Sequence, residues 1–235
     1  MQPYPYPPVE VKVWGDIACF TRPDAKVERV TYDVMTPSAA RGVLESIFWK
    51  REMQWRVREI LVLHPVRHIS LVRNEVKSRV SATSAQIWSK RGGGYYADED
   101  HTPRHTVALR DVAYIIRADA LVVPGVAADP AKYRHQFRER VKKGQCYRTP
   151  FLGCREFAAS FEPPNGKEQV QDVNTELEWM LFDLAYQGKY AGWATPHFFE
   201  TKVVHGVLTV PDHHYDELSR LSDEERGKHA VTSAR

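Results

Sequence analysis

The residues that could do chemistry gather in one segment of the chain. Residues 132–155, KYRHQFRERVKKGQCYRTPFLGCR, hold eight Lys and Arg against one acidic residue, Glu139. The rest of the chain holds 25 Lys and Arg against 29 Asp and Glu, a net charge of −4, although the whole chain stands at +3. Positive charge concentrated in this way indicates an anion-binding surface, and a polyanion is the natural first candidate.

Most of this segment is predicted to be a helix over roughly residues 130–143. Asp129 and Pro130 read as an N-cap and a first-turn proline, and Gly144 reads as the stop signal. Lys132 then falls in the first turn, where the helix dipole disfavours a cation but the free N–H groups favour an anion. Lys132 is therefore either a phosphate ligand or an ordinary solvated lysine. Tyr133, spaced with Phe137 and Val141 at helical intervals, also fits a buried apolar stripe.

Other candidates for chemistry give weaker signals. Arg104 and His105, side by side in a polar stretch, could provide an acid or base near an anionic substrate, or form an ordinary surface pair. The ten histidines lack metal-ligand spacing: Pro65 separates His64 from His68, and His213–His214 has no Cys or His partner at a zinc spacing. We expect no metal site and no cofactor, and the glycines form no nucleotide-binding pattern.

Length and composition limit the class of protein. The 235 residues are 43% hydrophobic and 27% charged, which is typical of a soluble globular protein. No apolar run approaches the roughly 18 residues of a membrane span, and the N-terminus lacks a secretion signal. Cys19, Cys146 and Cys154 are scattered and odd in number, which favours reduced thiols in a cytoplasm over a disulfide framework.

Hydrophobic periodicity predicts the elements that must position the basic segment. We expect strands near residues 9–13, 55–66, 105–117 and 150–161, and helices beginning at Thr36-Pro37 and at residue 130. The order β-α-β-β-α-β predicts an α+β, ferredoxin-like sheet with both helices on one face. The polar stretch between the second and third strands, which contains Gly92–Gly94, is predicted to be an extended hairpin or a mobile loop.

Three units follow from this assignment. Residues 1–162 form the ferredoxin-like domain, with the hairpin or loop of about 67–104 inserted in it. The turn signal at residues 163–166 separates a small C-terminal β-sheet over 163–215. Residues 216–235 are highly charged with few large apolar side chains, so we expect a flexible tail.

Several sequence blocks resemble a known family. VEVKVWGDIACFTRP, TYDVMTPSAARGVLESIFWK, TVALRDVAYIIRADA and GQCYRTPFLGCREFAASFE, spread over residues 9–162, resemble the CRISPR-associated family-five RAMP proteins of subtype I-C. WMLFDLAY at 179–186 also fits. The resemblance implies an RRM-type ferredoxin-like domain with a smaller C-terminal β-sheet. It also implies metal-independent cutting of CRISPR precursor RNA at the base of the repeat hairpin.

The resemblance further implies partners. The protein would stay on the 5′ handle of the guide RNA (crRNA), beside the backbone and large subunits of the type I-C interference complex. A non-catalytic subunit that caps the 5′ handle is the alternative. Double-stranded DNA is a further possible ligand, because a basic helix does not discriminate between polyanions.

Cutting of this kind needs a base for the ribose 2′-OH, a cation for the phosphorane and an acid for the leaving 5′-oxygen. Carried over from the family, Lys132 is the cation, Tyr133 stands in the position of the family's His, and Phe48 in that of its Tyr. His135, about 200° around the helix from Tyr133, and His105 are alternative acids or bases. The expected RNA-binding residues are basic: Arg104, Arg134, Arg138, Lys142, Lys143, Arg148 and Arg155.

Overall fold

The computed structural model describes residues 6–25, 27–94, 96–123, 125–186 and 194–220. Its strands are β1 (Val9–Ala18), β2 (Arg29–Val30), β3 (Met53–Val62), β4 (His68–Val76), β5 (His101–Val122), β6 (Ser160–Glu162), β7 (Thr175–Tyr186), β8 (Ala194–Val204) and β9 (Val207–Thr209). Its helices are α1 (Pro37–Ile47), α2 (Ala82–Arg91), the short 3-10 turn η1 (Ala97–Glu99) and α3 (Pro130–Lys142).

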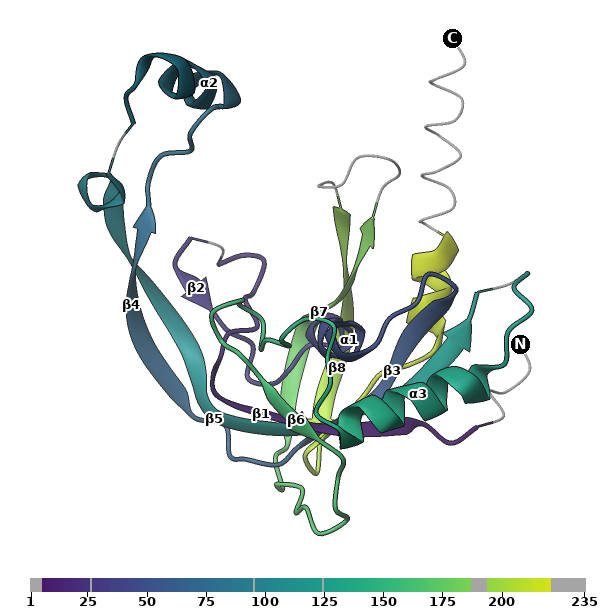
Figure 1. The fold of residues 1–235 in the computed structure, drawn as a ribbon. Helices are drawn as coiled ribbons and strands as arrows, with labels where there is room; N and C mark the ends of the chain where they lie inside the picture. The colour runs from purple at the N-terminus through teal and green to yellow at the C-terminus, as the bar shows by residue number, and fades with distance from the viewer. Residues whose placement is uncertain (1–5, 26, 95, 124, 187–193, 221–235) are drawn as a thin grey trace.

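Nine strands join in one sheet, which makes this a mixed α/β fold dominated by a curled, mainly antiparallel sheet (Figure 1). The hydrogen-bonded order is β6-β1-β5-β3-β9-β8-β7, while β2 and β4 pair with β5 outside this path. Alternate residues of β1 point into the core, because Val9, Val11 and Val13 are at most 1% exposed. The predicted first strand and the two predicted helices are confirmed.

Helices α1 and α3 pack in the same hydrophobic cluster. Leu44 of α1 and Phe137 of α3 are both fully buried there, and the Phe137 ring lies 4.8 Å from that of Trp55 on β3. A bidentate ion pair also ties α1 to β7, since the Arg41 guanidinium donates to both carboxylate oxygens of Asp183 at 2.7 Å. Both helices are thereby fixed against the sheet.

Within the predicted insertion at 67–104, the described residues include strand β4, helix α2 and the start of β5, which together form an arm. β4 pairs with the first half of β5, and α2 lies at the tip, which Figure 1 shows far from α3. The third strand is therefore longer than the predicted 105–117, because β5 serves both the arm and the central sheet. β3 ends at Val62, short of the predicted residue 66, and Pro65 has no N–H to continue a ladder.

The fourth strand was predicted over 150–161, and most of that prediction is wrong. Only Ser160–Glu162 is strand, and a compact turn closed by a bridge between Phe151 and Ala158 precedes it. Gly153 adopts φ +84° in this turn, which a strand residue does not. The apolar residues of the segment are buried through the turn, so their pattern imitated a strand.

The C-terminal strands continue the main sheet, because β9 pairs with β3 and β8 with β9. The unit boundary at residue 163 therefore stays a prediction, with one sheet running through both units. Residues 213–220 are helical. The Tyr215 hydroxyl donates to the Val57 carbonyl at 3.0 Å, and Asp216 pairs with Arg56 at 3.0 Å. Residues 216–220 of the predicted flexible tail are thus helical, and 221–235 lie outside the described residues, so the tail stays a prediction.

Within the described ranges, no helix is both long enough and apolar enough to cross a membrane.

Candidate active site beside helix α3

Helix α3 begins where its sequence signals place it. The Asp129 carboxylate accepts a hydrogen bond from the Ala131 N–H at 2.8 Å, and Pro130 occupies the first turn. Lys132 is exposed in that turn. The N–H groups of Ala131 and Lys132 both donate to Asp129, so the Lys132 ammonium is the group here that can clamp a phosphate oxygen.

Tyr133, also in the first turns of α3, is 5% exposed, and its hydroxyl donates to the Glu52 carboxylate at 3.0 Å. Burial, followed by the adjacent Glu52 charge, raises the pKa of Tyr133. The backbone N–H of Glu52 itself, then Tyr133, and then the charges of Lys50 and Lys132 lower the pKa of Glu52. Tyr133 is therefore a protonated phenol that holds a carboxylate, which makes it a poor proton acceptor.

Phe48 ends helix α1 and lies next to Tyr133, with their ring centroids 6.3 Å apart. The structure thus brings together two of the positions that the family resemblance singled out. Phe48 is 2% exposed, and its carbonyl accepts from the Trp55 indole at 2.9 Å. The Arg140 guanidinium lies 5.4 Å over the Phe48 ring and donates to the Ile47 carbonyl at 3.0 Å. This contact fixes the last turn of α3 against the end of α1.

A shallow hollow of about 370 Å³ lies between the end of α1 and the exposed flank of α3. Its lining consists of Phe48, Lys50, His135, Gln136, Glu139 and Arg140. His135 and Lys132 are three residues apart on α3, so they are neighbours on the helix surface. His135 therefore points away from Tyr133, as helical geometry requires, and still lies beside Phe48.

His105 lies far from this hollow. It sits on the arm, opposite Val72 of β4, and its N–H donates to the Glu28 carboxylate. His105 and Val122 are 17 residues apart on β5. At about 3.3 Å per residue, that is roughly 55 Å along the strand. Only the Val122 end of β5 leads into α3, so His105 does not share a site with Lys132.

The predicted RNA-binding cations differ in exposure, in ion pairing and in their place in the fold. Arg138, Lys142, Arg148 and Arg155 are exposed, as expected. Lys143 is exposed and pairs with Glu139 at 3.4 Å, whereas Arg104 pairs with Glu28 at 3.6 Å on the arm. Arg134 is 4% exposed, and its guanidinium lies 5.2 Å over the Tyr6 ring. Arg134 is therefore a buried residue and not one of the exposed cations that could bind RNA.

Two exposed aromatic residues that were not predicted from the sequence lie near the end of α1, beside the hollow. Tyr147 is 78% exposed, and the N–H groups of Tyr147 and Arg148 donate to the Ser46 carbonyl at 2.8 and 3.1 Å. Trp49, which follows Phe48, is 53% exposed. Exposed rings among cations can stack on unpaired bases. Lys50 and Glu52 were also missed, although both stand in the run FWKRE directly after the first helix.

The different surroundings of Arg138 and Arg134 predict different effects of alanine. Arg138→Ala removes an exposed cation, so the slope of log affinity against log salt for RNA should fall by roughly 0.7–0.9. Arg134→Ala, the matched control in the next turn, opens a buried site and should instead lower the unfolding midpoint. Binding titrations at several salt concentrations and thermal melts check both. An unchanged salt slope for Arg138→Ala would remove Arg138 from the RNA contact.

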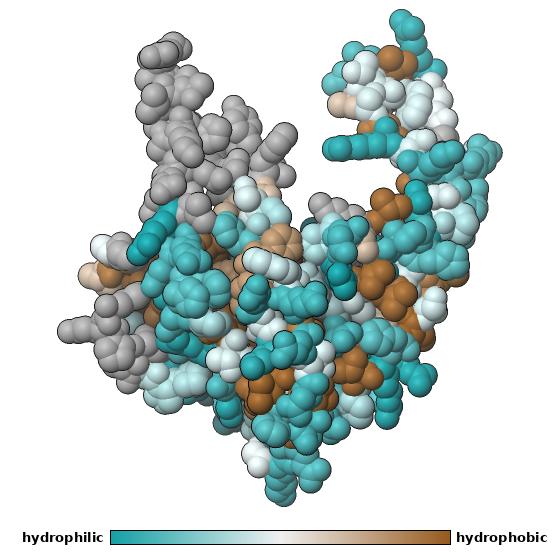
Figure 2. Space-filling view, turned by 180° about the vertical axis from the view of Figure 1, so that it is seen from behind, coloured by the Kyte–Doolittle hydropathy of each residue, from teal (hydrophilic) through white to brown (hydrophobic). Residues whose placement is uncertain are grey.

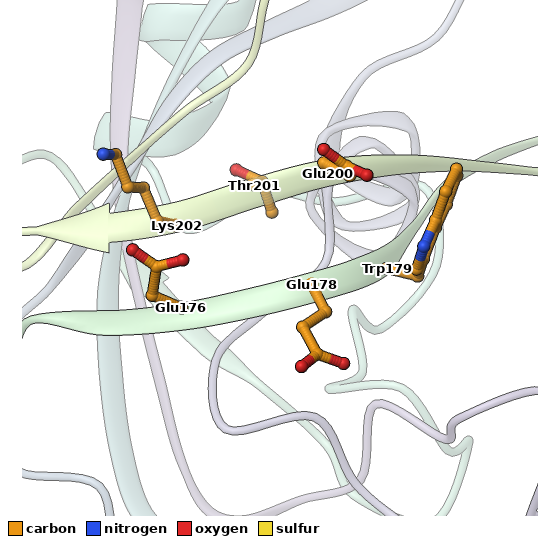
Figure 3. A pocket seen from close by; sticks show the side chains of 6 residues that line it. All are labelled: Glu176, Glu178, Trp179, Glu200, Thr201 and Lys202. Carbon is orange, nitrogen blue, oxygen red and sulfur yellow. The ribbon is translucent and has the colours of Figure 1, made fainter.

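A second hollow has the opposite electrostatic character. It lies on β7 and β8, and Figure 3 shows the side chains that line it: Glu176, Glu178, Trp179, Glu200, Thr201 and Lys202. Three carboxylates against one ammonium would repel a phosphate backbone. The α3 hollow is therefore the better candidate for an anionic ligand. No group of three or more His, Cys, Asp or Glu side chains suited to a metal occurs within the described part of the chain.

A family model and two curated relatives all place the chain in the same family. The family model Cas_Cas5d, CRISPR-associated protein (Cas_Cas5), matches residues 9–217. A protein of Thermus thermophilus named CRISPR pre-crRNA endoribonuclease Cas5d is 42% identical over 230 residues, which cover 92% of this chain and 96% of that protein. A protein of the same name from Mannheimia succiniciproducens is 39% identical over 225 residues, covering 90% and 98% of the two chains.

Two solved structures share the fold. The crystal structure of a CRISPR-associated protein superposes with a TM-score of 0.60 at 21% identity, covering 87% of this chain and 91% of that one. The crystal structure of a functionally uncharacterized protein from Streptococcus mutans also has a TM-score of 0.60, at 19% identity, covering 88% and 93%.

Proposed function

This chain belongs to the CRISPR-associated Cas5 family, matching its Cas5d model, and we propose that it is an endoribonuclease that cuts CRISPR precursor RNA. The observation that carries the catalytic assignment is the placement of Lys132 and His135. Both are exposed neighbours on the flank of α3, and His135 lines the hollow beside Phe48. A cation and an imidazole exposed side by side on one helix are suited to transfer of an RNA phosphoryl group.

The reaction is attack of a ribose 2′-oxygen on its own 3′-phosphorus. His135 takes the proton of the 2′-OH or gives one to the leaving 5′-oxygen, and the Lys132 ammonium stabilises the extra negative charge on the phosphorane. The bond from phosphorus to the 5′-oxygen breaks. The products are a 2′,3′-cyclic phosphate and a 5′-OH. No step in this sequence requires a metal ion.

The geometry supports His135 over the other two candidates for the acid or base. The Tyr133 hydroxyl is already bound to Glu52, and its raised pKa opposes loss of its proton. His105 lies on the arm. Tyr133 is assigned a positioning role instead, because its hydrogen bond holds the loop after α1 against α3. Phe48 shapes the hollow and has no group that can move a proton.

The finer description of the fold belongs to the same proposal. The first four sheet strands of the β-α-β-β-α-β order are β1, β3, β5 and β6, and their spatial order is β6-β1-β5-β3, each antiparallel to its neighbour. This order supports a ferredoxin-like sheet, with α1 and α3 as its two helices. The arm and strands β7–β9 are additions to it.

Partners follow from the surfaces. The α3 face suits the 5′ handle of the crRNA, and the same cations would accept double-stranded DNA. The arm suits a protein partner: in Figure 2 it rises from the body as a lobe with hydrophobic patches among hydrophilic ones. Its exposed apolar residues include Val72, Val76, Ile87 and Tyr96. We assign the arm to the neighbouring backbone or large subunit of the type I-C interference complex.

One assay tests the proposed activity. The purified protein is incubated with its own repeat RNA in EDTA, beside a copy of that RNA with a 2′-deoxy substitution at the cut site. Cleavage of the first RNA and not of the second is expected, because the deoxy copy lacks the nucleophile. Tight binding of both RNAs without cleavage would favour the alternative, a non-catalytic subunit that caps the 5′ handle.

A further inference from the structure

Two buried cysteines lie together outside the proposed site. Cys19 follows β1 directly, and Cys154 lies in the turn between Phe151 and Ala158. Cys19 is fully buried and Cys154 is 7% exposed, and both belong to one small hydrophobic cluster with Ala108. Although 135 positions separate them in the sequence, the fold makes them neighbours.

The backbone around the two cysteines is already in contact. The Cys19 N–H donates to the Leu152 carbonyl at 3.0 Å, and the Cys154 thiol lies 3.8 Å from the Cys19 carbonyl. A Cβ at Gly153 would meet that carbonyl at 2.0 Å, so only glycine permits this approach. The Cys154 Sγ thus lies within contact distance of the Cys19 main chain. Joining them would therefore need no large movement of the chain.

The surroundings favour ionisation of Cys19 over ionisation of Cys154. The hydrogen bond from Cys154 lowers the pKa of Cys19 to about 6, against the effect of burial and with help from Thr21, Arg29 and Arg73. The same bond, with burial, raises the pKa of Cys154. The Cys19 Sγ lies 3.5 Å from the Thr21 hydroxyl, and an Arg29 nitrogen lies 3.8 Å from the Cys154 Sγ. A thiolate next to a neutral thiol is the arrangement of a nucleophile with its resolving partner.

We propose that Cys19 and Cys154 are an oxidation site that forms a reversible intramolecular disulfide with hydrogen peroxide. The Cys19 thiolate attacks one peroxide oxygen, the O–O bond breaks, and sulfenic acid and hydroxide form. The Cys154 sulfur then attacks the Cys19 sulfur and displaces the sulfenic oxygen, which leaves as water with the Cys154 proton. The hydroxide takes up the proton released when Cys19 ionised. Two thiols and one peroxide thus give one disulfide and two waters.

The disulfide would tie the end of β1 to the turn that precedes β6. A crosslink that closes so long a loop removes much of the freedom of the unfolded chain. We expect the midpoint of thermal unfolding to rise by roughly 5–15 °C on oxidation and to return with dithiothreitol. Cys146 is exposed and serves as the internal control.

The test uses the full chain carrying Cys146→Ser. After peroxide treatment, we expect its mass to fall by two hydrogen atoms and digestion to yield one peptide pair joined through Cys19 and Cys154. In a version that also carries Cys154→Ser, or Cys154→Ala if that folds better, dimedone should trap a sulfenic acid at Cys19. The unsubstituted chain needs no variant: differential alkylation should show Cys19 and Cys154 lost together and recovered together by dithiothreitol.

Three outcomes would overturn the proposal. The first is a folded protein whose Cys19 and Cys154 stay free thiols at peroxide concentrations that consume Cys146. The second is conversion of either one to sulfinic acid without a crosslink, and the third is a crosslink that always includes Cys146. None of these readouts depends on RNA cleavage, so the proposed activity stands or fails separately.

Discussion

Replacing Lys132 with alanine should slow cleavage of repeat RNA by about 10²- to 10³-fold, because the phosphorane loses the cation that stabilises its charge. The dissociation constant should rise by less than about tenfold, since we expect Arg138, Lys142 and Arg148 to keep contacting the RNA backbone. Single-turnover cleavage rates with saturating protein, measured beside equilibrium binding of an uncleavable 2′-deoxy RNA, separate the two effects.

Lys142→Ala is the matched control for this prediction. Lys142 is an exposed lysine at the other end of the same helix, about ten residues or roughly 15 Å from Lys132 along the helix axis. Its loss should weaken binding to a similar extent and leave the single-turnover rate unchanged. If Lys132→Ala lowered the affinity for RNA as much as it lowered the cleavage rate, Lys132 would be only one of the RNA-binding cations and not a catalytic residue.

Replacing His135 with alanine should lower the cleavage rate by about 10²- to 10⁴-fold, the usual contribution of a general acid or base. Tyr133→Phe should leave the rate within a few-fold, because the phenol donates its proton to Glu52 and its pKa is raised. The loss of that hydrogen bond should lower the midpoint of thermal unfolding instead. Rate–pH profiles of both variants beside the unsubstituted protein provide the measurement.

Two further readouts distinguish proton transfer from positioning at His135. A variant that lacks the imidazole should lose the limb of the pH profile that the imidazole produces, and added imidazole should restore part of the rate. If Tyr133→Phe were the slow variant and His135→Ala were not, the proton would pass through Tyr133, the residue in the position of the family's His.

Local signals in the sequence were sufficient for the elements that hold the site. Thr36-Pro37 and Asp129-Pro130 mark helix starts that depend on caps within a few residues, and both start as predicted. Hydrophobic periodicity located β1, β3 and the central part of β5, but not β2, β4 or α2. These features are encoded by neighbours along the chain, so a single sequence carries them.

Features that depend on contacts between distant parts of the chain could not be predicted from these local signals. The spacing of Arg134 on α3 suggested an outer cation, but its side chain is buried beside Tyr6. Helical geometry separated His135 from Tyr133 correctly, yet only the folded chain places His135 beside Phe48. The turn at 151–158 depends on the close approach of Gly153 to Cys19, which no local pattern announces.

The chemical ends of the product test the central claim most directly. Cleavage by 2′-oxygen attack in EDTA must leave a 2′,3′-cyclic phosphate on the upstream fragment and a 5′-OH on the downstream fragment. We expect both, read as resistance of the upstream 3′ end to phosphatase until acid opens the ring, and as direct labelling of the downstream 5′ end by polynucleotide kinase. A 3′-OH with a 5′-phosphate would contradict the account, because those ends require an external water as the nucleophile.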